Sequence, residues 1–358
     1  MKPYLSIIIP YYNAGDTIGR LLETIFKSKN APPFEVIVVD DGSRDKFQIP
    51  KSKFQTKRKN ILKSKNYQLK AIHLKMNLGP AAARNRGAKA ARGKFLVFLD
   101  SDVELFPDTL HNLARNYRDD PDIVAQTGVW VKEQKSRAFF PNFKALRDWS
   151  YWINERDKSG YYFLFSTRIA SIKKAVFKRL GGFDERYPGA LVEDIELTYR
   201  IARRYAIIFA PDVRVRHEFE GFWPIAKKYF LRAYYWTQLY AKRKKFDPVA
   251  TTWWEALTAL TATGSVVLTL VILIFFGILF IFSMYYGVSI QNYGTIRQAT
   301  VILNTIPMIL LIFHIFMVRK FIVFMYKEKG LAFAVKGFFT GLILYCFITA
   351  GAAWGRIK

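Results

Sequence analysis

Two aspartates follow an apolar run in the stretch FLVFLDSDVEL, between Phe95 and Leu105. Asp100 and Asp102 are two positions apart, and residues i and i+2 of an extended chain point to the same side. Because their charges repel, we expect a positive group between the two carboxylates or good access to water. Paired carboxylates can hold Mg²⁺ or Mn²⁺, which keep open positions for substrate phosphates. Many turns contain this spacing, so the pair needs further polar residues nearby to indicate a site.

Such residues follow two other apolar runs. Asn13 comes after YLSIIIP, and Asp40 and Asp41 come at the end of FEVIVVD. Together with YQLKAIHL and KFLVFLD, these runs alternate with segments of helical spacing, which predicts an α/β sheet with parallel strands. Ligands of such sheets bind beyond the carboxyl ends of the strands. We therefore expect the polar residues that follow these strands to gather at one edge of the sheet.

A second acidic pair, Glu193 and Asp194, begins the helical pattern VEDIELTYRIARR. Acidic residues at this position can simply favour the helix dipole. The loop GGFDE, which contains Asp184, can likewise be only a helix C-cap. His217 follows the strand pattern VRVRH, and a single histidine is more often a structural residue. These patterns alone leave both the structural and the functional interpretation open.

Five motifs occur in a fixed order: SIIIPYYNAGDTI, VIVVDDGS, NLGPAAARNRGAKAARGKFLVFLDSD, LGGFDE and EDIELTYRI. Together they resemble the family 2 glycosyltransferases, over roughly residues 2–217. The resemblance implies a GT-A fold, a Rossmann-like α/β domain that binds a nucleotide-diphosphate sugar. It also implies a UDP- or GDP-sugar as donor and Mg²⁺ or Mn²⁺ as the metal.

The resemblance implies roles for individual residues as well. Asp194 is the general base, Asp184 and Glu193 contact the acceptor, and the metal ligands are Asp102, Asp100 and His217. A positioned carboxylate can take the proton of an acceptor hydroxyl, and a metal stabilises the departing diphosphate. Attack opposite the leaving group inverts the anomeric centre. The residues implied at the donor nucleotide are Pro10, Tyr12, Asn13, Asp40, Arg84, Asp100 and Ser101.

The C-terminal third of the chain is strongly apolar. No charged side chain occurs in residues 256–296, and further apolar runs cover 298–318 and 337–355. Each can supply the ~20 residues of a transmembrane helix, so we predict spans at about 256–286, 299–318 and 332–354. Residues 319–330 are rich in Lys and Arg, which predicts a cytoplasmic position for them and for the large N-terminal part. We expect a multi-pass protein of the cell membrane, with domains at 1–222, 223–250 and 251–358.

Basic residues dominate two other segments. Residues 223–246, WPIAKKYFLRAYYWTQLYAKRKKF, mix aromatic with basic residues, which favours an amphipathic helix in the membrane interface over a helix packed on the soluble domain. The lysine-rich stretch 44–70 is either a solvated loop or an arm attracted to anionic lipid. The net charge of +27 favours an anionic membrane surface or phosphorylated substrates, and we expect no nucleic-acid partner. The single cysteine, Cys346, excludes a disulfide framework.

These features predict an inverting, metal-dependent glycosyltransferase that moves one sugar to a hydroxyl of a membrane- or lipid-linked acceptor. No Q-x-x-R-W follows the Glu-Asp pair, which argues against a processive synthase. One alternative is a polyisoprenyl (dolichyl)-phosphate sugar synthase with a phosphate acceptor. Another is a basic binding protein with a decayed site, which the presence of Asp40, Asp100, Asp102 and Asp194 disfavours.

Overall fold

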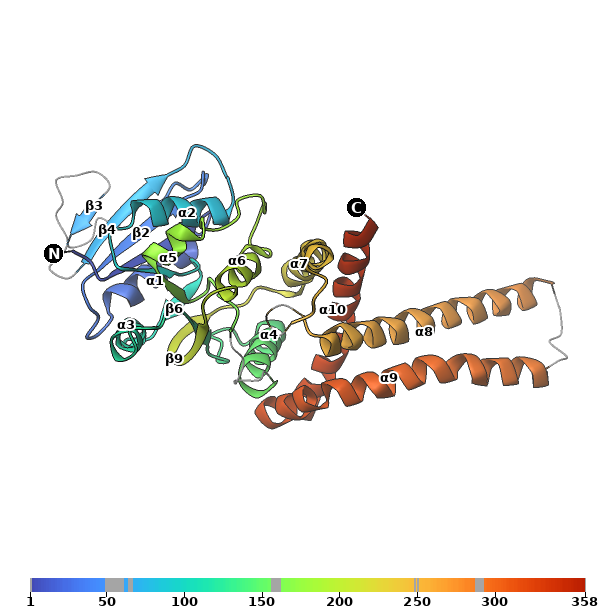
Figure 1. Ribbon diagram of the computed structural model, residues 1–358. Helices are drawn as coiled ribbons and strands as arrows, with labels where there is room; N and C mark the ends of the chain where they lie inside the picture. Colours follow the sequence, from blue (N-terminus) through green and yellow to red (C-terminus); the bar gives the residue numbers. More distant parts are fainter. Residues whose placement is uncertain are drawn as a thin grey trace. The chain divides into compact units, whose positions relative to one another are not determined.

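The computed structural model describes residues 2–48, 61–63, 67–155, 162–247, 249, 251–286 and 293–357 (Figure 1). Most of the lysine-rich stretch 44–70 lies outside these residues, so its attraction to lipid stays a prediction. The chain divides into two compact units. The first consists of Met1–Gly221 with Pro248–Ala250, and the second of Phe222–Asp247 with Thr251–Lys358. We call them the sheet unit and the helical unit.

The sheet unit is built on a mixed sheet, whose described strands have the order β3-β4-β2-β1-β5-β8-β7-β9-β6. β4, β2, β1 and β5 are parallel, which confirms the predicted α/β class. β8 is antiparallel to both β5 and β7, β9 is parallel to β7, and β6 is antiparallel to β9. The strands are β1 Leu5–Tyr11, β2 Phe34–Asp40, β3 Ile61–Lys63, β4 Tyr67–His73, β5 Phe95–Phe98, β6 Val103–Leu105, β7 Ala125–Trp130, β8 Ala170–Lys173 and β9 Ile207–His217.

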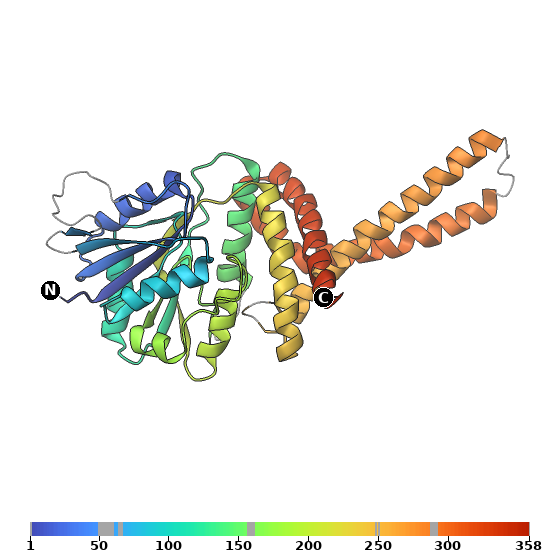
Figure 2. The ribbon, with the colours of Figure 1, turned by 90° about the horizontal axis from the view of Figure 1, so that it is seen from above.

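Helices cover both faces of this sheet (Figure 2). Alternate residues of β1 belong to different cores: Ile7 and Ile9 lie in one, with α1, while Ile8 lies in the other, with α2. α2 approaches the sheet closely, because a Cβ added at Gly87 would lie 2.5 Å from a methyl carbon of Ile8. The helices are α1 Gly15–Phe26, α2 Pro80–Ala90, α3 Thr109–Asp119, α4 Phe139–Ser150, which continues as the π-helical turn η1 Tyr151–Glu155, α5 Lys174–Arg179 and α6 Glu193–Ala202.

The strand register gathers the predicted site residues at the carboxyl edge of the sheet. Tyr11, at the end of β1, pairs with Asp40 at the end of β2. β5 ends at Phe98, the residue that pairs with Ile8, so the turn that contains Asp100 and Asp102 follows at the same edge. The pairing of Val103 with His217 then brings β6 and β9 together directly after Asp102.

The helical unit contains α7 Phe222–Arg243, α8 Trp253–Tyr286, α9 Tyr293–Lys329 and α10 Leu331–Ile357. α8, α9 and α10 are each long and apolar enough to cross a membrane, and they contain the predicted spans. α8 and α9 form a hairpin, and α10 crosses this hairpin near one end in both views (Figures 1 and 2).

α7, the predicted amphipathic helix, packs on α10 within the helical unit. The approach is close because α10 presents two glycines to it. A Cβ added at Gly351 would lie 2.1 Å from the carbonyl oxygen of Phe230, and one at Gly355 would lie 2.6 Å from that of Tyr234. The two glycines are one turn apart, so they form a small-residue face of the kind that lets helix backbones meet. The predicted place of α7 in the membrane interface stays a prediction.

Candidate functional site

Asp40 organises the loop after β2. Its carboxylate accepts the backbone N–H groups of Ser43 and Phe47, both at 2.9 Å, and lies 3.1 Å from Nδ1 of His73. Burial by itself raises the pKa of Asp40, but the hydrogen bonds from Ser43, Phe47 and His73 outweigh it and lower the pKa. The carboxylate is buried and shapes this loop, so it offers no exposed surface for the predicted contact with a donor.

The loops after β1 and β2 are bonded to each other. Asn13 has a φ of 48°, its side-chain oxygen accepts the N–H of Arg44 at 3.0 Å, and its own N–H donates to the hydroxyl of Ser43 at 3.0 Å. Tyr12 beside it is exposed, and Pro10 is half-buried on β1. Asp41 accepts the N–H groups of Leu78 and Gly79, both at 2.8 Å. The structure thus brings the predicted donor residues Pro10, Tyr12 and Asn13 to one edge of the sheet.

Arg84 forms a buried triad of charges. Its guanidinium donates from Nη1 to Glu193 at 2.8 Å and from Nη2 to Asp100 at 2.7 Å. Arg84 is 1 % exposed and Glu193 is 2 % exposed. Glu193 also accepts the N–H of Leu191 at 2.8 Å. In the structure Arg84 and Glu193 neutralise each other, because buried charges must be paired. The contact of Arg84 with the donor and that of Glu193 with the acceptor stay predictions.

Asp102 and His217 face each other across the β6–β9 pair. Oδ2 of Asp102 lies 3.4 Å from Nε2 of His217. Burial by itself raises the pKa of Asp102, but the nearby His217 and Arg168 lower it to about 2, so the carboxylate is charged at neutral pH. Oδ1 of Asp102 and Nδ1 of His217 are buried and have no hydrogen-bond partner among the described residues. Half-buried Ser101 lies in the same turn.

The predicted ligand set for a metal is met in part. The structure brings Asp102 and His217 together, while Asp100 turns to Arg84 instead. Where the structure describes the chain, no three His, Cys, Asp or Glu side chains gather in a way that could hold a metal. A carboxylate oxygen and an imidazole nitrogen are donors that Mn²⁺ accepts. The unpaired Oδ1 of Asp102 fits such an ion, whose remaining positions would be left for phosphate and water oxygens.

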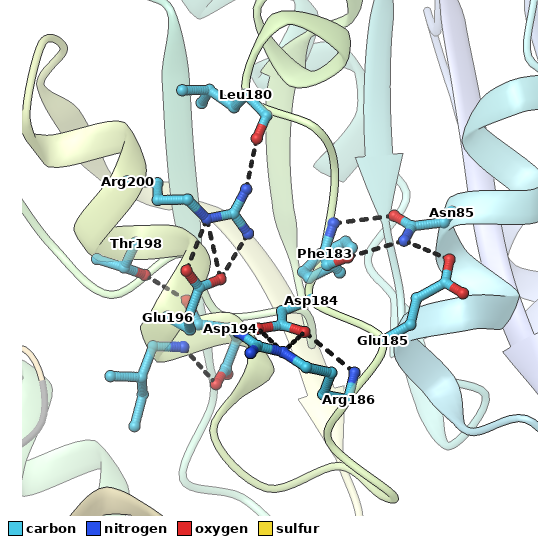
Figure 3. Close-up of polar contacts among 11 residues, drawn as sticks. Asn85, Leu180, Phe183, Asp184, Glu185, Arg186, Asp194, Glu196, Thr198 and Arg200 are labelled. Carbon is cyan, nitrogen blue, oxygen red and sulfur yellow. Dashed lines mark hydrogen bonds and ion pairs between the residues drawn. The ribbon is translucent and has the colours of Figure 1, made fainter. Parts of the chain in front are cut away.

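Asp194 lies in the first turn of α6, half-buried (Figure 3). Its Oδ1 accepts the N–H of Ile195 at 2.8 Å, and its carbonyl oxygen accepts the hydroxyl of Thr198 at 2.6 Å. The partial positive charge of the helix N-terminus favours an ionised carboxylate here. Two residues further along α6, Glu196 accepts three bonds of 2.5–3.0 Å from the guanidinium of Arg200.

The GGFDE loop is fixed by Asn85, which bonds to the backbone N–H and carbonyl of Phe183 and to Glu185, at 2.8–2.9 Å (Figure 3). Gly182 has a φ of 75°, and a Cβ there would lie 2.5 Å from the side-chain oxygen of Asn85. Asp184 accepts bonds of 2.6–3.1 Å from the exposed side chain of Arg186, which lowers the pKa of Asp184. Its predicted contact with an acceptor would have to displace Arg186.

Sequence reasoning missed Arg168 and Trp130, which lie next to the Asp102–His217 pair. The guanidinium carbon of Arg168 is 4.4 Å from the centre of the Trp130 ring. Neither residue belongs to a motif. Their contact depends on the close passage of β7 and the segment before β8, where the N–H of Gly128 donates to the carbonyl of Ile169 at 2.9 Å.

Comparison with known proteins finds a family that matches the first half of the chain. The family described as "Glycosyl transferase family 2" matches residues 6–179. The uncharacterized glycosyltransferase YibD of Escherichia coli (strain K12) is 33% identical over 129 residues, 35% of this chain and 34% of the relative. The validoxylamine A glucosyltransferase of Streptomyces hygroscopicus subsp. limoneus is 29% identical over 227 residues, 56% of this chain and 48% of the relative. The chain thus spans between a third and a half of the length of these relatives.

A solved structure shows the same fold. The mannosyltransferase PcManGT from Pyrobaculum calidifontis, in complex with GDP-Man and Mn²⁺, aligns with a TM-score of 0.53 and 18% sequence identity. The alignment covers 99% of this chain and 88% of that chain. It supports the mixed α/β architecture described above.

Proposed function

Residues 6–179 form a glycosyltransferase family 2 domain, and we propose that this enzyme moves one sugar from a nucleotide-diphosphate sugar to a hydroxyl of a membrane- or lipid-linked acceptor. The proposed transfer is metal-dependent and inverts the anomeric centre. The donor would lie at the carboxyl edge of the sheet, where the loops after β1 and β2 and the Asp100–Asp102 turn meet.

The observation that carries this proposal is the charged, incompletely paired Asp102 beside His217. These two residues would hold Mg²⁺ or Mn²⁺. When bound, the ion would stabilise the charge that develops on the leaving diphosphate. The fold is shared with a mannosyltransferase whose structure contains GDP-Man and Mn²⁺, which is in keeping with such a donor and metal.

Asp194 is the proposed general base. It lies half-buried at the start of α6, and Glu193 beside it anchors the same turn through Arg84. A sugar or lipid hydroxyl is a weak acid and gains ~10²–10⁴-fold from a positioned base. A phosphate acceptor, whose second pKa is ~6, needs none. The presence of Asp194 at this position therefore favours a hydroxyl acceptor over the alternative phosphate acceptor.

We propose that α8, α9 and α10 anchor the enzyme in the membrane with its sheet unit on the cytoplasmic side. The three helices are apolar enough to cross it. The C-terminal part of α9 carries Arg319, Lys320, Lys327 and Lys329, which favours the cytoplasm for that end. An acceptor that carries a lipid would then be held in the same membrane as the enzyme.

The test uses the full chain purified in detergent and a panel of nucleotide sugars, with lipid extracts as acceptors. We expect transfer that is lost in chelator and restored by Mg²⁺ or Mn²⁺, in the wild type but not in Asp102→Asn. Asp119→Asn, a change at an exposed aspartate of α3, is the matched control. Full transfer in chelator would contradict the metal dependence, and an acid-labile phosphosugar product would favour the phosphate acceptor.

A further inference from the structure

Arg168 is an arginine with little internal bonding. Its side chain is 17% exposed, and its guanidinium carbon lies over the rings of Trp130, at 4.4 Å, and Phe219, at 5.6 Å. Its ion pair with Asp148 has an N···O distance of 3.7 Å, too long for a hydrogen bond. A guanidinium has five N–H donors. Within the described part of the chain, none of these five reaches a hydrogen-bond acceptor.

A second arginine of the same unit shows the contrast. Arg84 is almost fully buried, and its guanidinium donates to two carboxylates at 2.7 and 2.8 Å. That is the arrangement of an arginine whose role is to hold the fold together. Arg168 is held by the faces of two aromatic rings instead, which fix the guanidinium plane and leave its N–H edges available.

The neighbours of Arg168 carry unpaired polar atoms. Nε1 of Trp130, Nδ1 of His217 and Oδ1 of Asp102 are buried without a hydrogen-bond partner among the residues that the structure describes. Trp130 is 1% exposed and His217 is 8% exposed. Contacts link the group: His217 lies 3.4 Å from Asp102, and its ring centre lies 4.5 Å from that of Phe219, over which Arg168 also lies.

Unpaired buried polar atoms are costly, at about 1–3 kcal/mol each, and they are rare in folded proteins. Three unpaired buried atoms near the guanidinium of Arg168 indicate a place where a polar ligand could bind. The stacked guanidinium requires an anion, and its planar edge of N–H groups matches the oxygens of a phosphate. Because Arg168 also lowers the pKa of Asp102, the two side chains lie within each other's electrostatic field.

We propose that Arg168 binds a phosphate group next to Asp102. This inference rests on the proposed function, which supplies two sources of phosphate: the diphosphate of the donor and a phosphate monoester on a lipid acceptor. In either case Trp130 orients the guanidinium before the ligand arrives, so less conformational entropy is lost on binding. Arg168 then contacts the ligand directly, whereas Arg84 acts only through Asp100 and Glu193.

The experiment measures binding by calorimetry to the full chain in detergent, in the presence of chelator so that no metal contributes. The probes are UDP and GDP, each compared with its nucleoside, and farnesyl phosphate compared with farnesol. The variants are Arg168→Gln and Arg168→Lys. Arg214→Gln is the matched control, because Arg214 also lies over a ring, that of Phe106 at 5.2 Å, with an ion pair of 3.7 Å to Asp108.

We expect Arg168→Gln to weaken phosphate binding by about 10- to 100-fold, the loss that follows removal of hydrogen bonds to a charged group. Binding of the nucleosides and of farnesol should not change. Arg168→Lys keeps the charge over Trp130 but loses the planar edge, so it should fall between wild type and Arg168→Gln. It also provides a folded variant if the glutamine substitution prevents folding.

The outcomes separate the two proposals. A loss confined to UDP or GDP identifies the phosphate as that of the donor, and a loss confined to farnesyl phosphate identifies it as that of an acceptor; both support the inference. If Arg168→Gln binds all phosphates as the wild type does, the inference is overturned while the proposed function stands. If the wild type binds neither UDP nor GDP even after Mg²⁺ or Mn²⁺ is restored, the proposed function itself fails, and the inference with it.

Discussion

Two halves of the carboxyl edge of the sheet use their polar groups differently. After β1 and β2, the carboxylate oxygens of Asp40 and Asp41 all accept bonds within the protein. Between β6 and β9, Asp102 and His217 each keep a buried atom that bonds to no described residue. The first half has its bonds satisfied by the fold and sets the shape of the edge. The second half leaves hydrogen-bonding atoms that the proposed ligand could use. Substitutions in the first half should therefore lower stability, and substitutions in the second half should lower ligand binding.

The largest effect is expected outside both halves, at Asp194. Asp194→Asn should lower turnover ~10²–10⁴-fold, because the acceptor hydroxyl loses its general base. Donor affinity and melting temperature should stay near those of the wild type, as for other groups that act in the transition state. Kinetics with a saturating donor and binding of that donor measure the two quantities. Normal turnover in this variant would rule out the hydroxyl mechanism. Glu196→Gln, two residues further along the same helix, is the control.

Substitutions in the buried triad of Arg84, Glu193 and Asp100 should lower the stability of the fold, whereas Asp194→Asn should lower turnover. Arg84→Met leaves Glu193 as an unpaired buried charge, so the free energy of unfolding should fall by about 3–5 kcal/mol. Replacing Glu193 by Leu in the same chain should recover part of the loss. Denaturant unfolding of the full chain in detergent, followed by circular dichroism, measures both variants. If Arg84→Met unfolds at the same denaturant concentration as the wild type but binds the donor more weakly, Arg84 contacts the donor directly, as the sequence predicted.

Asp40 and Asp41 should give opposite pH dependences of stability. The pKa of Asp40 is lowered by folding, so its contribution is complete above its unfolded pKa of ~3.9 and is lost as pH falls below that value. The pKa of Asp41 is raised, chiefly by burial, so its contribution is greatest below ~3.9 and diminishes as pH rises towards the folded pKa.

The substitutions Asp40→Asn and Asp41→Asn separate these two contributions. Each should cost about 1–3 kcal/mol at neutral pH through the lost hydrogen bonds. Asp40→Asn should reduce the loss of stability in acid, whereas Asp41→Asn should steepen it. Melting temperatures between pH 3 and pH 7 provide the measurement. Identical slopes in the two variants would contradict the assignment of opposite shifts.

Effects on stability of similar size are expected in the helical unit, where the contact between α7 and α10 is one of close packing. Gly351→Ala should destabilise the packing of α7 on α10 by about 1–3 kcal/mol, since its Cβ would meet the backbone of Phe230. Gly341→Ala is the matched control on the same helix, where an added Cβ meets nothing within 4 Å. It should be neutral or stabilise by up to ~1 kcal/mol. Equal melting temperatures in the two variants would show that the α7–α10 contact adds little.

The sequence predicted the elements whose patterns are local. β1, β2, β4 and β5 are apolar runs, α1 and α2 have helical spacing, and α8–α10 are long enough to be recognised from apolar length alone. β6 and β8 were not predicted, because each has only three or four residues and is a strand through its pairing partners. Strand β7, AQTGVW, has a glycine within it and no clear alternation, so its pairing with β8 and β9 also had to come from the structure.

The candidate site shows the same limit. The resemblance led to Asp102 and Asp194, which belong to the five motifs, and to His217, which lies in the strand pattern VRVRH. It did not show that Arg84 pairs with Glu193, a residue 109 positions away, or that Arg168 stacks on Trp130. Charge pairing and stacking depend on which segments the fold brings together, and a single sequence gives only the residue types.

The two glycines of α10 have a consequence for the order of events during synthesis. All strands of the described sheet end by His217, so the sheet unit can fold while the rest of the chain is still being made. α7 follows directly, but its partner residues Gly351 and Gly355 emerge only after α8 and α9. The newly made basic helix must therefore wait for these two glycines before its packing can be completed. Synthesis of α10, rather than the emergence of α7, sets the time at which the helical unit can assemble.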